Sequence, residues 1–132
     1  MPKIEHVGIA VTDLNKAMAV YEKILGEKAY KIEDQEIEKV RVAFFKTGDS
    51  KIELLEATDE SSAIYQFISK KGAGVHHIAL ATNDINAEVE RLKSEGLVLI
   101  EGYPRKGADN KMVAFLHPRS VEGTLVELCQ EM

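Results

Sequence analysis

The chain has 132 residues, of which 45% are hydrophobic and 30% charged, a balance typical of a single compact domain spanning 1–132. Its formal net charge of −5 excludes a strongly basic surface, so we expect no nucleic-acid partner. One cysteine excludes an intrachain disulfide, and no apolar run approaches the ~20 residues of a membrane span. No signal-like segment opens the chain. We therefore expect a cytoplasmic protein without a membrane partner.

The first half of the chain predicts a strand, a helix and three strands. Alternate β-branched residues after His6 indicate the first strand. Asp13 lies where the N-cap of a helix belongs, and Gly26 lies where that helix should end. Turn residues and apolar alternation then predict three strands, at about 28–33, 40–46 and 51–57.

The second half predicts the same order of elements. A short connecting helix is expected to begin at Ser61 or Ser62. A strand then follows His77, and Asp84 is placed to cap the next helix. The last three strands are expected at about 97–101, 111–116 and 124–129.

The two halves are also related residue by residue. Two blocks match at an offset of 71 (77 − 6), and a third matches at 74 (127 − 53). The matched blocks are His6–Leu14 with His77–Ile85, Val42–Phe45 with Val113–Leu116, and Ile52–Leu54 with Val126–Leu128. We therefore predict an α+β fold of two tandem βαβββ modules, about 1–58 and 73–132, joined by a short helix. Together they would form a concave mixed sheet with its helices on the outside.

Strand parity places one histidine and one glutamate of each module on the sheet face that lies away from the helices. These residues are His6, Glu53, His77 and Glu127. The first-strand neighbours of each histidine on that face are glycine or alanine, which predicts open space above them. Any one of the four alone is more often a structural residue, but their repetition favours a site for one divalent cation. Nitrogen and carboxylate donors suit Co²⁺, our first choice, and also Mn²⁺, Ni²⁺ or Zn²⁺.

Other ionisable residues receive structural interpretations. Parity directs His76 toward the helices, and Cys129 is interpreted as a small hydrophobic residue on the face of Glu127. Glu5 and Glu56 are interpreted as solvated charges.

The stretches that carry these residues resemble the vicinal oxygen chelate superfamily, which includes glyoxalase I, and within it the methylmalonyl-CoA epimerase family. The resemblance runs essentially end to end. Its most telling stretches are His6–Val11, Lys51–Glu56, Gly74–Ala79 and Lys111–Ser120. It implies metal-dependent epimerisation of (2R)- and (2S)-methylmalonyl-CoA through proton transfer at C2 and an enediolate.

The resemblance also implies the roles of particular residues. The four ligand positions of the family match His6, Glu53, His77 and Glu127. The acyl-CoA substrate would be covered by two segments, with the substrate-binding residues Lys106, Lys111, His117, Arg119 and Ser120. A homodimer is a further implication.

Proton transfer to and from C2 requires a group on each face of that carbon. Glu127 is the first candidate for a base, and Glu53 or a metal-bound water is the second. One position departs from the family, since apolar Val42 aligns with a strand glutamate proposed as a base in some epimerases.

Two other functions fit the same fold. A lactoylglutathione lyase would use similar ligands, but glutathione carboxylates favour arginine forks, and parity directs none of the arginines toward the predicted face. These arginines are Arg41, Arg91, Arg105 and Arg119. A non-catalytic small-molecule binding protein is the second alternative, and the complete set of four ligands counts against it.

Overall fold

The computed structural model describes residues 3–132, which form two compact units. We call residues 6–76 the N-terminal unit, and residues 77–132 with residues 3–5 the C-terminal unit. Each unit contains one βαβββ module, so the predicted α+β class and its duplicated module are confirmed. The single domain over 1–132 stays a prediction. No helix within the described part of the chain is long and apolar enough to cross a membrane.

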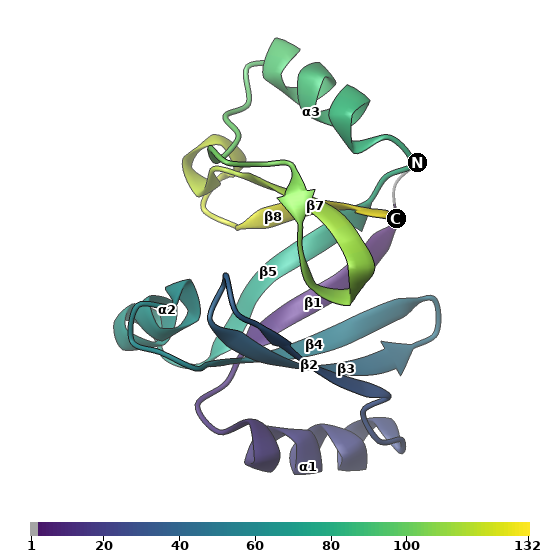
Figure 1. Ribbon diagram of the computed structural model, residues 1–132, viewed down its shortest axis with the longest axis vertical. Coiled ribbons are helices and arrows are strands. Elements are labelled where there is room, and N and C mark those ends of the chain that lie inside the picture. Colours follow the sequence, from purple (N-terminus) through teal and green to yellow (C-terminus); the bar gives the residue numbers. More distant parts are fainter. Residues whose placement is uncertain (1–2) are drawn as a thin grey trace. The chain divides into compact units, whose positions relative to one another are not determined.

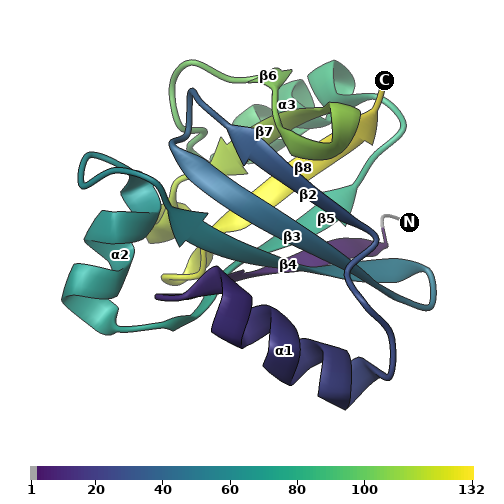
Figure 2. The ribbon, with the colours of Figure 1, turned by 60° about the horizontal axis from the view of Figure 1, so that its bottom comes forward.

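The N-terminal unit contains a mixed sheet with strand order β2-β3-β4-β1, in which β1 runs parallel to β4 and the other pairs are antiparallel. Helix α1 runs along one face of this sheet (Figure 2). The elements are β1 (Ile4–Ala10), α1 (Leu14–Leu25), β2 (Lys31–Gln35), β3 (Val40–Thr47), β4 (Ser50–Ala57) and α2 (Ala63–Lys71). The first of the three strands predicted after α1 begins later than expected, and Ser62 is the N-cap of α2.

Local capping and apolar packing explain why α1 forms where it does. The Asp13 carboxylate accepts a hydrogen bond from the Lys16 N–H, and Gly26 ends the helix with φ 75°. The apolar stripe of α1 packs against Val11, Phe45 and Leu54, which confirms the predicted helix-facing side of these strands. The Leu14 N–H also donates to Glu56 Oε2 at 3.0 Å. The interpretation of Glu56 as a solvated charge is therefore wrong, because this carboxylate satisfies a free amide at the helix start.

The C-terminal unit has strand order β5-β8-β7-β6, with β5 parallel to β8 and the other pairs antiparallel. Figure 1 shows α3 beside the strands of this unit. The elements are β5 (Gly74–Ala81), α3 (Ile85–Ser94), β6 (Arg105–Lys106), the 3₁₀ turn η1 (Ala108–Asn110), β7 (Lys111–Leu116), the 3₁₀ turn η2 (Pro118–Val121) and β8 (Val126–Glu131). The Ile85 N–H donates to Gln130 Oε1 at 2.7 Å, which repeats the contact made by Glu56 in the other unit.

The strand predicted at 97–101 is wrong. Within that range, Leu99 makes an isolated bridge to Leu116, while the strand that pairs alongside β7 is β6. Leu99 instead packs with Ile85 and Val89 of α3 in the apolar cluster of this unit. Leu99 of this apolar run therefore contacts the helix, and the edge of the sheet is formed by more polar residues further along the chain.

The β2–β3 hairpin carries an exposed ion pair, in which Arg41 Nε donates to Asp34 Oδ1 at 2.8 Å. This hydrogen bond lowers the pKa of Asp34 below its ordinary value of 3.8. Because the folded-state pKa is the lower one, the pair stabilises the fold above about pH 4 and loses its contribution as the pH falls further.

We therefore expect Asp34→Asn to flatten the acid dependence of the urea unfolding midpoint below about pH 4, with little change near neutral pH because the pair is exposed. Urea titrations of both proteins over this range would check it. An unchanged acid dependence would contradict this role of the pair.

Candidate active site

In the N-terminal unit, His6 and Glu53 form a buried pair. Strands β1 and β4 lie in parallel register with Gly8 opposite Glu53, so His6 precedes the paired position by two residues and points to the same face. The His6 Nδ1 atom lies 3.1 Å from Glu53 Oε2, and the two residues are only 3% and 4% exposed.

In the C-terminal unit, His77 and Glu127 form the equivalent pair. Ala79 lies opposite Glu127 in the parallel register of β5 and β8, and His77 again precedes the paired position by two residues. The His77 Nε2 atom lies 3.1 Å from Glu127 Oε1, and both residues are 5% exposed. Each predicted histidine therefore meets the glutamate of its own module.

The repeat extends to the strand beyond each glutamate. Phe44 of β3 lies opposite Glu53, and Phe115 of β7 lies opposite Glu127. The ring of Phe115 meets the His77 ring edge-on, with centroids 6.1 Å apart. An aromatic residue thus borders each carboxylate and limits the side chains that the carboxylate can contact.

The geometry of each pair fits two neighbouring ligands of a divalent cation. Metal–nitrogen and metal–oxygen bonds of about 2.0–2.2 Å place two ligands at a right angle roughly 3 Å apart, close to the 3.1 Å measured in both pairs. Burying a carboxylate costs several kcal/mol unless a cation or hydrogen bonds compensate it. Each pair can therefore supply one imidazole nitrogen and one carboxylate oxygen to a metal ion.

The ligand-bearing face of the C-terminal unit is packed near the histidine and open further along the strands. Ala79 is fully buried in a cluster with Val113 and Cys129, against which Tyr103 and Phe115 pack. The predicted open space above Ala79 is therefore wrong, because aromatic side chains fill it. A cavity of about 280 Å³ lies instead next to Cys129 and the neighbouring strand ends.

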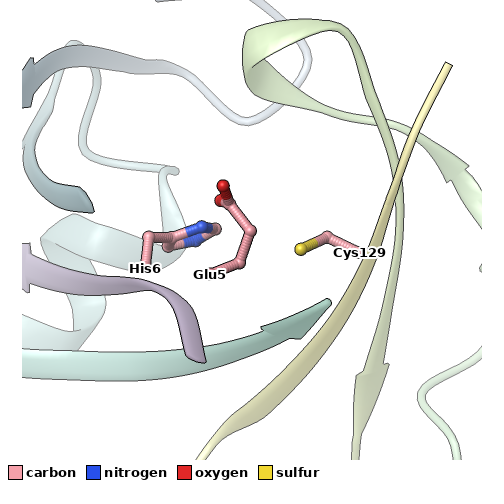
Figure 3. Close-up of side chains that lie close together, drawn as sticks. All are labelled: Glu5, His6 and Cys129. Atoms are coloured by element: carbon pink, nitrogen blue, oxygen red, sulfur yellow. The ribbon is translucent and has the colours of Figure 1, made fainter. Parts of the chain in front are cut away.

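Glu5 and Lys111 form a buried ion pair that lines this cavity. Their side chains are 6% and 5% exposed, with Lys111 Nζ 3.9 Å from Glu5 Oε2. Lys111 Nζ also lies 3.6 Å from a carboxylate oxygen of Asp109 and 3.6 Å from one of Glu131. Figure 3 shows Glu5 beside Cys129 of β8, with His6 following Glu5 in the chain. The interpretation of Glu5 as a solvated charge is wrong, because β7 supplies a buried lysine that sequence spacing does not reveal.

The remaining candidates lie on β5, on β6 and in the turn that follows β7. His76 packs edge-on against Phe67 of α2, with ring centroids 4.9 Å apart, which confirms its structural position. His117 Nδ1 accepts a hydrogen bond from the Arg119 N–H, and the Ser120 hydroxyl donates to the His117 carbonyl oxygen. Lys106 and Arg119 are exposed. Substrate contacts by these residues and by Lys111 stay predictions.

Two charged residues on the ligand-bearing faces were missed by strand parity. Glu33 lies opposite Val42 on β3, which places it on the face of Glu53. Arg105 lies opposite Val113 on β7, which places it on the face of Glu127 and corrects the expectation that no arginine is directed there. Both residues can be placed only when it is known which residue of the neighbouring strand lies opposite each of them.

Comparisons with known proteins agree with this architecture. Residues 5–115 match the model of the Glyoxalase/Bleomycin resistance protein/Dioxygenase superfamily. The ethylmalonyl-CoA/methylmalonyl-CoA epimerase of Cereibacter sphaeroides is 43% identical, covering 97% of both chains. The methylmalonyl-CoA epimerase structure from Mycobacterium tuberculosis superposes with a TM-score of 0.93 at 34% identity, covering 98% of this chain and 87% of the other.

A further solved structure contains a bound ligand. It is a variant of the Streptomyces coelicolor methylmalonyl-CoA epimerase in complex with 2-nitronate-propionyl-CoA, at TM-score 0.91 and 35% identity, covering 98% of this chain and 94% of the other. These matches confirm the glyoxalase-like fold that the sequence resemblance implied.

Proposed function

The chain belongs to the Glyoxalase/Bleomycin resistance protein/Dioxygenase superfamily and groups with its methylmalonyl-CoA epimerases, and we propose that it interconverts (2R)- and (2S)-methylmalonyl-CoA. The observation that carries the proposal is the duplicated buried pair, His6 with Glu53 and His77 with Glu127, in a chain that resembles these epimerases over nearly its whole length.

We propose that both pairs together hold one divalent cation. Two imidazoles and two carboxylates leave about two positions free in a six-coordinate site, which suits a catalytic centre. Cobalt is our first choice, with manganese, nickel and zinc as alternatives, because borderline and hard donors are combined. When bound, the cation supplies Lewis-acid stabilisation of the negative charge that develops on the thioester oxygen.

The chain's own residues must then move the C2 proton. Glu127 is the first candidate because its carboxylate is buried and ordered by His77, and Glu53 is the second because it occupies the equivalent position in the other module. One group removes the proton from one face of C2, and the group on the other side donates a proton to the opposite face. This inverts the centre through the enediolate. Each such transfer typically contributes ~10²–10⁴-fold to the rate.

Substrate binding and assembly complete the proposal. The turn residues His117, Arg119 and Ser120, with Lys106 and Lys111, are proposed to contact the acyl-CoA, as the sequence resemblance implies. A homodimer is proposed on the same ground. A cytoplasmic location is proposed because a single cysteine fits a reducing compartment.

The decisive experiment follows exchange of the C2 hydrogen of methylmalonyl-CoA in D₂O by NMR, with metal content measured on the same samples. We expect exchange by the cobalt-loaded protein, loss of exchange after chelation and recovery when cobalt is restored. His77→Ala should lose both exchange and bound cobalt. His76→Ala is the matched control and should retain both, because its ring packs against Phe67.

The same preparation separates the alternative functions. If the protein isomerised the glutathione hemithioacetal of methylglyoxal and did not exchange the C2 hydrogen of methylmalonyl-CoA, it would be a lactoylglutathione lyase. Ethylmalonyl-CoA should be tested in parallel, since the name of the Cereibacter relative includes it. Metal-loaded protein that catalyses neither reaction would leave the binding-protein alternative.

A further inference from the structure

We propose that Arg105 is a specificity-determining residue that binds an anionic group of the acyl-CoA substrate, and that Tyr103 positions its guanidinium. This inference rests on the proposed epimerase function. Its starting point is the register of β6, which places Arg105 opposite Val113 and hence on the face of Glu127.

A continuous chain of ring contacts connects this arginine to the histidine of the C-terminal unit. The Phe115 ring meets His77 edge-on, and the Tyr103 ring meets Phe115 edge-on with centroids 5.1 Å apart. The Arg105 guanidinium then lies over the Tyr103 ring, with Cζ 4.4 Å from its centroid. Arg105 Nη2 also donates to the Tyr103 hydroxyl at 3.0 Å.

These contacts fix the guanidinium before any ligand arrives. A cation over a tyrosine ring is stabilised by the ring quadrupole, and the hydroxyl hydrogen bond sets its direction. Gly107 lies two residues after Arg105, and a Cβ at this position would lie only 3.0 Å from a methyl carbon of Val113. The chain around Arg105 therefore packs tightly on β7. Less conformational entropy is then lost when the arginine binds an anion.

Comparison of the two modules indicates why an arginine at this position matters. Val42 and Val113 are equivalent in the repeat, and the residues opposite them are Glu33 in the first module and Arg105 in the second. The histidine–glutamate pairs are duplicated, but these neighbouring positions carry opposite charges. This difference gives the ligand-bearing faces of the two modules unequal charge, so the face of Glu127 favours the anionic part of the substrate.

The chemistry of an arginine fork matches carboxylate and phosphate oxygens, which accept two parallel hydrogen bonds. Strand spacings place the Arg105 Cα roughly 12 Å from that of Glu127, so the guanidinium acts on a part of the substrate beside the reacting carbon. The chain carries a net charge of −5, and a fixed local cation offsets the repulsion that a polyanionic acyl-CoA would meet.

The test compares kcat and KM of Arg105→Met, Arg105→Lys and Tyr103→Phe with the wild-type protein, using C2 epimerisation of methylmalonyl-CoA. We expect KM to rise at least tenfold in Arg105→Met with a smaller change in kcat. Arg105→Lys should recover only part of the loss, because it keeps the charge but loses the fork. Tyr103→Phe should raise KM less, because the ring remains and the hydroxyl is lost. Arg91→Met is the matched control, since Arg91 pairs with Glu88 on the surface of α3.

A truncated substrate identifies the anion. With methylmalonyl-pantetheine, which lacks the CoA phosphates, a retained KM effect assigns Arg105 to the carboxylate, and a lost effect assigns it to phosphate. Equal KM values for wild type and both Arg105 variants would overturn the inference. If Arg105→Met does not fold, Arg105→Lys and Tyr103→Phe decide it. Inactive wild-type protein would instead refute the epimerase proposal. Titration of the protein with CoA and with malonate would then test Arg105 directly. Equal affinities of wild type and Arg105→Lys for both anions would overturn the inference.

Discussion

Replacing Glu127 by glutamine is expected to slow C2 exchange of methylmalonyl-CoA by about 10²–10⁴-fold and to weaken cobalt binding. Glutamine keeps the shape of the side chain, but it cannot accept the C2 proton and it removes the charge 3.1 Å from His77 Nε2. Exchange measured by NMR at saturating substrate, with bound cobalt determined on the same protein, separates the two effects.

Two matched variants make this result interpretable. Glu90→Gln removes an exposed carboxylate from α3 of the same unit and should leave exchange and metal content unchanged. Glu53→Gln makes the equivalent change beside His6 and should slow exchange less than Glu127→Gln, because Glu53 is the second candidate for a base. A Glu127→Gln protein with the wild-type exchange rate would exclude Glu127 as a base.

Replacing Lys111 by methionine is expected to lower the free energy of unfolding by about 3–5 kcal/mol. The lysine side chain is 5% exposed, and its removal leaves the buried Glu5 carboxylate without this cation. Methionine fills most of the same volume, so the loss reports the charge and not a cavity. Urea unfolding followed by circular dichroism measures it.

A double variant distinguishes the ion pair from other roles of Lys111. Adding Glu5→Gln to Lys111→Met removes the uncompensated charge and should recover much of the lost stability. Lys93→Met, on the exposed surface of α3, should cost little. If Lys111→Met kept the wild-type stability and only raised KM, Lys111 would act on the substrate and the buried pair would not contribute to folding.

Features that depend on short-range periodicity followed from the sequence. Alternation after His6 and His77 predicted which strand residues face α1 and α3, and the apolar clusters of both units confirm it. Asp13 and Asp84 were predicted as caps, and both accept a backbone hydrogen bond at the start of a helix. The repeat predicted that each histidine shares a face with the glutamate of its module, and both pairs are formed.

Features that depend on which strand meets which did not follow from local patterns. The apolar run at 97–100 is typical of a strand, yet the partly buried Leu99 packs against residues of α3 and Arg105 takes the position opposite Val113. Glu5 was interpreted from the sequence as a solvated charge, because only the fold brings Lys111 of β7 next to it.

The sequence by itself determined the duplicated module, the faces of the first and last strand of each module, and the two histidine–glutamate pairs, because side-chain direction in a strand alternates at a fixed period of two. The tertiary structure alone decided the edge strand of the second module, the buried pair of Glu5 and Lys111, and the placement of Arg105 on the face of Glu127. The Glu5–Lys111 pair joins residues distant in the chain, whereas β6 pairs with the nearby β7, and the free energy of both contacts is set by burial and pairing, which no local pattern encodes.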